Sequence, residues 1–411
     1  MENSTVTVET AKGIRRNLDR FLKQFDDCIG TRPSRAHLRT YVGGQIGNLP
    51  RKSIEPIALE ANVAPRTLQE FLGLHRWDHA AMGRRVQQVV MRDHADENAI
   101  ALIDETSVAK KGVKTAGVQR QYCGASGKTD NCVVTVHLGY ATNDFATLLD
   151  GDLFLPEESW SGNEARRDEA GVPEHVVYRS KWRIALDLLE RSVQNGVRFK
   201  YLVADEFYGR AKPFRDGVEA LGLRYVVEIP CNIHGWTKAP RLETGRKGKM
   251  RLAGSETGAR RVDSLWLRGG PSWEAFHVKD TETGPVVWEV RTTPFFPKSG
   301  RLPGPAHWLL AARHVLTGEL KYFLSNAPAG TPVEALLHVA FSRAIVEQLF
   351  ENAKNEIGFD HFEVRHYLPL QRHLVLCAVS LLFLMQQKQA LRGKKPLVER
   401  RASARHCRSA A

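Results

Sequence analysis

The stretch AIALID, residues 99–104, is a short apolar run that ends in a carboxylate. Continuous apolar runs of this length, bounded by polar segments, are typical of strands buried on both faces of a parallel sheet. The stretch YLVAD, residues 201–205, repeats the pattern and ends at Asp205. A long helical pattern at 179–195 lies between the two runs. The sequence therefore predicts an α/β fold.

The character of the sequence changes along the chain and predicts five segments. Residues 1–95 read as helices separated by short polar turns, whereas 96–230 and 333–390 read as two parts of an α/β core. Residues 231–332 predict a mainly β insertion. Its strand-like pieces are DSLWLRG (263–269), VVWEVRTT (286–293), HWLLAARHV (307–315) and KYFLSNA (321–327). Residues 391–411 form a basic tail, which we expect to be mobile and which is a candidate nucleic-acid clamp.

Composition favours a basic cytoplasmic protein with no membrane partner. The formal charge of +13 and the pI near 9.5 suit a polyanionic partner such as nucleic acid, although charge alone fits a merely soluble chain equally well. The six cysteines show no CxxC pair and no zinc-finger spacing, which argues against a disulfide framework or a zinc site. The longest apolar run, 374–385, is too short to cross a bilayer and predicts a buried core helix.

Residues 53–72, SIEPIALEANVAPRTLQEFL, resemble a helix-turn-helix. Asn62 marks the turn, and Pro65 can open the second helix. The side chains that would then face a DNA major groove are Arg66, Thr67 and Gln69. Helical hairpins with this pattern also occur in many proteins that never touch DNA, so both interpretations stay open.

Residues 343–354, RAIVEQLFENAK, place three charges in one row of an otherwise uninterrupted helical pattern. At about 3.6 residues per turn, Arg343, Glu347 and Lys354 come to nearly the same angular position. An apolar face from Val346 to Ile357 adjoins this row, so Glu347 lies at the edge of a core. Taken alone, the row reads as a solvated face with paired opposite charges.

Two strand-end aspartates, Asp104 and Asp205, join Glu347 in a set of three carboxylates. The carboxyl ends of strands in an open α/β sheet are where ligand sites gather, although a single aspartate there often only caps a helix. Three converging carboxylates repel one another unless a cation lies among them. Oxygen-only ligands favour Mg²⁺ or Mn²⁺ over zinc, and two such ions suit phosphodiester cleavage and strand transfer.

The spacing of Arg343, Glu347 and Lys354 resembles the signature of DDE transposases of bacterial insertion sequences of the insertion-sequence 4 type. In that family a tyrosine usually stands three residues before the arginine, where this chain has Ala340. An ordered series of blocks resembles the insertion-sequence 701 branch more closely. It includes LIDETSVAKKG (102–112), YLVADEFYG (201–209) and IGFDHFEVRHY (357–367).

This resemblance implies an RNase H-like catalytic domain with an all-α N-terminal domain and the β insertion. It also implies a DNA transposase that binds the terminal inverted repeats of its insertion sequence, as at least a homodimer. Such an enzyme cleaves phosphodiesters with two Mg²⁺ or Mn²⁺ ions and joins the ends to target DNA, at the bacterial nucleoid. The alternatives are an inactive DNA-binding derivative and an RNase H-superfamily nuclease without strand transfer.

The resemblance also assigns residues. The catalytic and metal-binding triad would be Asp104, Asp205 and Glu347, and the phosphate-holding residues would be Arg343 and Lys354. Further candidates for DNA backbone contact, against the commoner case of solvated loop lysines, are Lys110, Lys111 and Lys128.

Several nearby residues compete for these roles. Glu105 and Glu206 would point away from the neighbouring aspartate, and pairing with a cation is their simpler role. Glu351 shares the helix side of Glu347 and is the main rival for the third ligand.

We expect Trp160 to be core and the pair Asp360 and His361 to be structural rather than metal-binding. The segment GASGKT (124–129) imitates a phosphate loop, but it joins two predicted strands, which argues against nucleotide binding.

Overall fold

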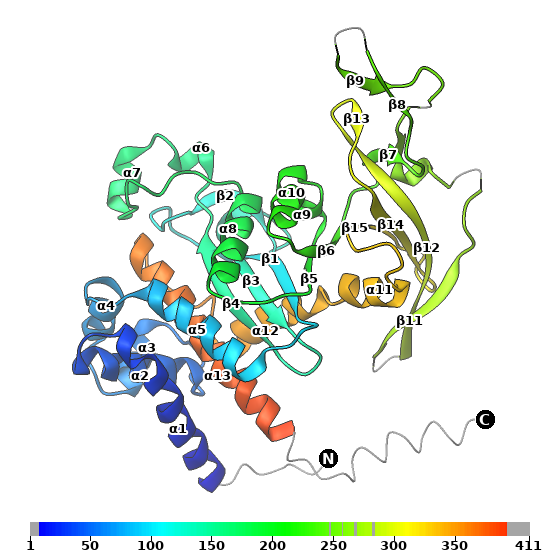
Figure 1. Cartoon of the computed structure of the whole chain (residues 1–411). Coiled ribbons are helices and arrows are strands. Elements are labelled where there is room, and N and C mark those ends of the chain that lie inside the picture. Colours follow the sequence, from blue (N-terminus) through cyan, green and yellow to red (C-terminus); the bar gives the residue numbers. More distant parts are fainter. Residues whose placement is uncertain (1–7, 246–247, 257, 267–268, 282–283, 393–411) are drawn as a thin grey trace, which may run out of the picture.

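The structure is a computed structural model that describes residues 8–392 except 246–247, 257, 267–268 and 282–283. The tail expected to be mobile, 391–411, lies outside the described residues from 393 onward. A large mixed sheet with helices on both faces forms the centre of the molecule (Figure 1). The expected α/β class is therefore confirmed, and the sheet is compatible with an RNase H-like fold.

The described part of the first 95 residues is helical. Its elements are α1 (Val8–Leu22), η1 (Lys23–Cys28), α2 (Arg32–Ile46), α3 (Ile54–Glu60), α4 (Pro65–Gly73) and α5 (His79–His94). Asn62 has a left-handed backbone with φ of 54°, and α4 begins at Pro65, so the predicted turn and second helix are confirmed. Asp78 caps α5 because its carboxylate accepts the Ala81 amide hydrogen at 2.9 Å.

These helices share their interior with the C-terminal helix α13 (Tyr367–Arg392). Arg372 of α13 is buried and donates to the carbonyls of Leu72 and Trp77, each at 2.9 Å. Burial lowers the pKa of this guanidinium to about 10. The Tyr41 hydroxyl lies 2.9 Å from Nδ1 of His373. Polar contacts as well as apolar packing thus fix the N-terminal helices to the core.

Helix α13 carries the apolar run 374–385. Its stretch Tyr367–Leu391 is long and apolar enough to cross a membrane by length and composition, which the run alone is not. However, 67% of its most apolar window is buried inside the protein, and it packs along the strand β4 (Ala146–Leu153). The predicted buried core helix is therefore confirmed.

The central strands run in the order β4, β3 (Lys128–Ala141), β1 (Ile100–Ala109), β5 (Tyr201–Ala204) and β6 (Arg224–Glu228). Strands β1, β5 and β6 are parallel, as the continuous apolar runs of β1 and β5 predicted for those two strands, and β3 pairs antiparallel with β1. The short β2 (Gln119–Cys123) pairs with the first half of β3, and residues 124–127 of GASGKT form their turn. The expectation that this segment joins two strands is confirmed.

The prediction that the first strand ends at Asp104 is wrong. β1 continues to Ala109 because β3 pairs with it along its whole length, from Ile100 with Ala141 to Ala109 with Cys132. The parallel pairing with β5 stops at Ile103. Asp104 therefore lies inside a strand, at the point where the parallel part of its pairing ends.

Helices cover the two faces of this sheet (Figure 1). One face carries α8 (Lys181–Gln194) and α10 (Lys212–Ala220), and the other carries α11 (Val333–Phe341) and α12 (Ala344–Ile357). Ile103 belongs to one apolar cluster with Leu188 of α8, whereas Leu102 belongs to the other with Leu349 of α12. Consecutive side chains of β1 thus pack against the helices on opposite faces of the sheet. Three short helices complete this part: α6 (Glu157–Trp160), α7 (Glu164–Glu169) and α9 (Glu206–Gly209).

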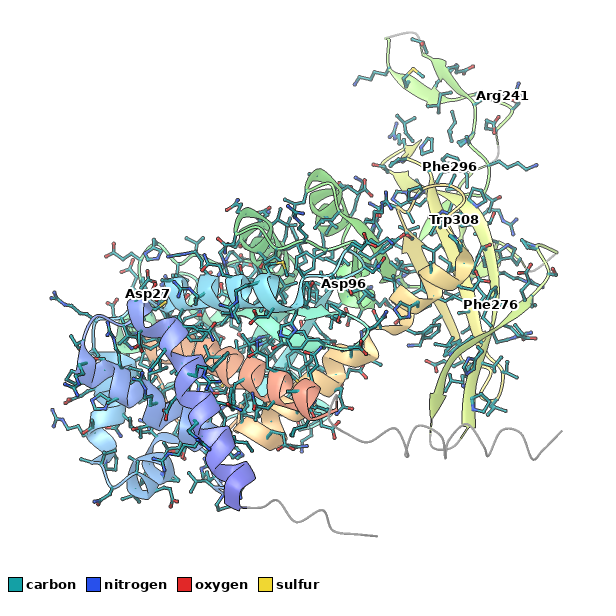
Figure 2. All side chains as sticks on the ribbon, turned by 60° about the horizontal axis from the view of Figure 1, so that its bottom comes forward. Asp27, Asp96, Arg241, Phe276, Phe296 and Trp308 are labelled. Carbon is teal, nitrogen blue, oxygen red and sulfur yellow. The ribbon has the colours of Figure 1, made fainter. Side chains whose placement is uncertain are left out.

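The segment 231–332 extends the central sheet. Its elements are β7 (His234–Trp236), β8 (Leu242–Thr244), β9 (Met250–Leu252), β10 (Arg260–Arg261), η2 (Val262–Ser264), β11 (Glu274–Thr281), β12 (Gly284–Ser299), β13 (Leu302–Pro303), β14 (His307–His314) and β15 (Leu320–Ser325). β15 pairs with β6, and β14 and β12 follow outward. Figure 2 shows Arg241, Phe276, Phe296 and Trp308 on this projecting part, away from Asp27.

The prediction of a strand at DSLWLRG (263–269) is wrong for the first residues of that stretch. Residues 262–264 form the helical turn η2. Val262 and Leu265 are both buried, and their separation of three residues suits a helical turn rather than the alternation of a strand.

Gly209 provides a test of the close packing between α9 and β6. A Cβ at this position would lie 1.9 Å from the backbone oxygen of Glu228, whereas a Cβ at Gly217 would meet the mobile end of Leu186. We expect Gly209→Ala to destabilise the protein by about 1–3 kcal/mol, and Gly217→Ala by less. Urea unfolding of both variants measures this, and equal stability of the two would contradict the packing described.

Candidate active site

Three acidic residues lie side by side where the parallel pairing of β1, β5 and β6 ends. Ile103 pairs with Ala204, and Ala204 pairs with Val227. The next residues are Asp104 on β1, Asp205 after β5 and Glu228 at the end of β6. Because neighbouring strands lie about 4.8 Å apart, these carboxylates gather at one edge of the parallel part of the sheet.

Asp104 lies on the α12 face of β1 and is only 7% exposed. Its Oδ2 accepts from Nη2 of Arg343 at 3.3 Å, and its Oδ1 accepts the Glu105 amide hydrogen at 2.8 Å. Burial raises the pKa of this carboxyl to about 7, against the opposing effect of Arg343, and the charge of Asp205 adds to the increase. Asp104 is therefore a carboxyl whose ionisation depends on nearby positive charge.

Asp205 ends the second apolar run and caps the short helix α9. Its Oδ1 accepts the amide hydrogen of Tyr208 at 3.3 Å. The capping role that a strand-end aspartate often has is thus present here. The charge of Asp205 nevertheless influences both Asp104 and Arg343, so its carboxylate belongs to the same group.

The helical pattern around Arg343 is not continuous, in contrast to the prediction. α11 ends at Phe341, the Ser342 hydroxyl donates to the carbonyl of Val339 at 2.7 Å, and Arg343 is the N-cap residue of α12. The predicted apolar face of α12, which includes Val346 and Ile357, is buried. This packing fixes the start of α12 against the sheet beside Asp104.

Arg343 bridges the strand and the helix. Its Nη1 donates to Oε1 of Glu347 at 2.7 Å, and its Nη2 donates to Asp104. The side chain is 27% exposed, whereas that of Glu347 is 59% exposed. Burial opposes the charge of the guanidinium, but the nearby carboxylates, Asp104 first, raise its pKa. Arg343 therefore supplies the positive charge that this acidic cluster requires.

Ala340, where the resembled family has an aromatic residue, is buried on α11. It packs in the apolar cluster that also contains Val346 and Phe350 of α12. A side chain in this position faces the core, so the missing aromatic does not leave a gap at the carboxylates.

Glu228 is a member of the cluster that the sequence prediction missed. Burial raises its pKa, while Lys321 and Arg343 lower it, and its carboxylate lies 3.5 Å from Nζ of Lys321. The signal was present in YVVE (225–228), a third apolar run that ends in a carboxylate.

Lys354 lies about two helical turns after Glu347 on α12 and is half-buried. Its positive charge contributes to the lowered pKa of His137, which burial brings to about 3. His137 is the residue opposite Asp104 on β3. Among the described residues, no carboxylate pairs with Lys354, so its ammonium group is available to an anion near the cluster.

Two of the competing carboxylates have other partners. Glu105 accepts from Nζ of Lys181 at 2.5 Å, so its expected pairing with a cation is confirmed. Glu351 is exposed and accepts from Gln348 at 2.9 Å. Throughout the part of the chain that the structure describes, no three His, Cys, Asp or Glu residues are close enough to hold a metal ion without rearrangement. The guanidinium of Arg343 lies between two of the expected ligands.

The other candidate DNA contacts are dispersed. Arg66 is 84% exposed and pairs with Glu70 at 2.7 Å, Gln69 is exposed, and Thr67 is half-buried. Two further candidates, both exposed, are Lys111 and Lys128.

Lys110 is engaged inside the protein. Its Nζ donates to the carbonyl of Phe362 at 2.6 Å and lies 3.4 Å from the centre of that ring. Burial lowers the pKa of this ammonium group to about 8. The roles proposed for these side chains in DNA binding stay predictions.

The structural roles expected for Trp160 and His361 are confirmed, whereas Oδ1 of Asp360 is buried and has no hydrogen-bond partner among the described residues. Trp160 is buried in the core. His361, three residues after the left-handed Gly358 that ends α12, accepts the amide hydrogen of Lys52 through Nδ1 at 3.0 Å. These contacts attach the end of α12 to the N-terminal helices.

Comparison with known proteins adds a family to this geometry. Residues 24–293 match the family described as DDE superfamily endonuclease, a range that contains Asp104 and Asp205 and ends before Glu347. Over 334 residues the chain is 28% identical to the probable transposase for insertion sequence element IS701 of Microchaete diplosiphon. The similarity covers 80% of this chain and 76% of that protein.

The raised pKa of Asp104 predicts pH-dependent binding of a divalent cation. Because its pKa is about 7, this carboxyl is mostly protonated below pH 7 and must lose its proton before it can bind a cation. The affinity for Mn²⁺ should therefore rise roughly tenfold per pH unit below pH 7 and level off above it. Calorimetry in buffers of different ionisation enthalpy measures the proton released. A pH-independent affinity, or an unchanged profile in Asp104→Asn, would contradict this assignment.

Proposed function

Because the chain belongs to the DDE superfamily of endonucleases and is a transposase of the insertion-sequence 701 type, we propose that it cuts and joins DNA at its own element. In this proposal it binds the terminal inverted repeats, cleaves phosphodiester bonds there and transfers the ends to target DNA. The observation that carries the proposal is the bridge from Asp104 through Arg343 to Glu347, beside Asp205.

The carboxylates fit a site for divalent cations. All the proposed ligands are oxygen donors, and the buried Asp104 lies beside a second negative charge and needs a cation to ionise fully. Asp104, Asp205 and Glu347 would hold two Mg²⁺ or Mn²⁺ ions. When bound, such ions supply activation of the attacking hydroxyl and stabilisation of the leaving oxygen.

The basic residues on α12 would hold the DNA. Arg343 has a planar guanidinium suited to phosphate oxygens, and Lys354 presents an ammonium group from the same helix. In the first step a water oxygen attacks phosphorus, and the bond to the 3′ oxygen breaks to leave a 3′-hydroxyl. In the second, that hydroxyl attacks a target phosphodiester directly, the bond from phosphorus to the target's own 3′ oxygen breaks, and this oxygen leaves as a free 3′-hydroxyl of the target strand. Neither step requires a covalent bond to the protein.

The remaining parts of the proposal concern domains and partners. Residues 96–230 and 333–390 would form an RNase H-like core, and residues 1–95 would read DNA through Arg66, Thr67 and Gln69. The insertion, 231–332, holds 15 Lys and Arg against 8 Asp and Glu, which supports a second DNA surface. Concerted action at two ends implies a homodimer on DNA, in the cytoplasm.

Cleavage of a labelled duplex that carries the terminal repeat tests the proposal. With Mg²⁺ or Mn²⁺, the protein should cut at the repeat boundary and join the 3′ ends to target DNA. Asp104→Ala and Glu347→Ala should each lose at least about 100-fold in rate, because a lost ligand removes several kcal/mol of transition-state stabilisation. The matched control on α12 is Glu351→Ala, which should retain activity.

Each other outcome identifies an alternative. End-specific binding without cleavage would favour the inactive DNA-binding derivative, and cleavage without joining would favour a nuclease. Activity that survives Glu347→Ala but not Glu351→Ala would mean that the third ligand was misassigned.

A further inference from the structure

Glu228 occupies a fixed position beside the proposed ligands. It follows Val227, which pairs with Ala204, and it lies opposite Phe323 on β15. Gly209 packs so closely on its backbone oxygen that no side chain fits there. The carboxylate is mostly buried and approaches a single ammonium group, Lys321, at 3.5 Å, which is longer than a well-formed hydrogen bond.

Arg343 has one hydrogen-bond donor without a partner in its present position. Both terminal nitrogens donate to carboxylates, but Nε is buried and has no hydrogen-bond partner among the described residues. A buried donor without a partner costs about 1–3 kcal/mol. A carboxylate that meets Nε and one terminal nitrogen together would satisfy the fork of the guanidinium.

Divalent cations would compete with Arg343 for its present partners. The oxygens of Asp104 and Glu347 that accept from Arg343 belong to two of the three proposed metal ligands. Two positive groups cannot share these oxygens without strong repulsion. The charge of Arg343 also lowers the pKa of Glu228, and Glu228 raises the pKa of Arg343. Glu228 is the one carboxylate of the cluster that is not a proposed ligand.

We propose that Glu228 is a positioning residue that accepts the guanidinium of Arg343 when divalent cations take Asp104 and Glu347. This inference rests on the proposed function. Arg343 then holds Asp104 and Glu347 together in one position and stands ready for a DNA phosphate in the other. Glu228 keeps the guanidinium within the site during the exchange.

Mn²⁺ binding without DNA tests this exchange, measured by electron paramagnetic resonance of the free ion. Arg343→Gln should tighten binding about fivefold, because it removes a competing cation. Glu228→Gln should weaken binding about fivefold in the natural chain, and by less than about twofold when Arg343→Gln is also present. This difference between backgrounds is the coupling that the exchange requires.

Two further variants separate the exchange from general effects of charge. Glu206→Gln removes an exposed carboxylate next to Asp205 and should leave binding the same within about twofold in both backgrounds. Glu228→Asp keeps the charge but shortens the side chain, so it should weaken binding only when Arg343 is present. It also preserves the test if Glu228→Gln fails to fold, as judged by circular dichroism.

The outcomes distinguish this inference from the proposed function. An equal weakening by Glu228→Gln in both backgrounds, or no weakening in either, would overturn the exchange alone. Absence of any Mn²⁺ binding that depends on Asp104 would overturn the proposed metal site and the exchange together.

Discussion

The ion pairs of Arg343 hold together two parts of the chain that are far apart in sequence. Asp104 precedes Arg343 by 239 residues, yet the two side chains meet at 3.3 Å, and Arg343 also binds Glu347 at 2.7 Å. Without this cation, the carboxylates at the sheet edge would repel one another across a partly buried space. The pKa of Asp104, about 7, reflects how strongly burial and Asp205 oppose its charge. The cluster is therefore built to contain a positive group.

The fold brings this group together through the sheet. Parallel pairing places Asp104, Asp205 and Glu228 in register, and the apolar face of α12 fixes the helix that carries Glu347. The long insertion does not interrupt this arrangement, because β15 returns beside β6 and extends the same sheet. Helix α12 then starts close to the strand ends, after the break at residue 342. The helical N-terminal segment and α13 share one apolar cluster, which also contains residues of the central strands.

Local patterns in the sequence predicted the two apolar strands that precede Asp104 and Asp205, the helical N-terminal segment and the buried helix α13 well. Contacts with distant residues explain what they missed. β1 extends past Asp104 because β3 pairs with its second half, and no property of residues 105–109 alone reveals that partner. Lys110 looked like a free loop cation, but its ammonium group is buried against Phe362 from the other end of the chain. Glu228 could have been found, since its run ends in a carboxylate like the other two.

The central claim is that Asp104, Asp205 and Glu347 converge on divalent cations once Arg343 moves away. Crystals of the protein grown with Mn²⁺ and a terminal-repeat duplex test it most directly, through anomalous diffraction at the manganese absorption edge. The account predicts anomalous peaks within about 2.0–2.3 Å of oxygens from all three carboxylates, with the guanidinium of Arg343 displaced from Asp104. Manganese bound elsewhere, or bound while Arg343 still bridges Asp104 and Glu347, would contradict it.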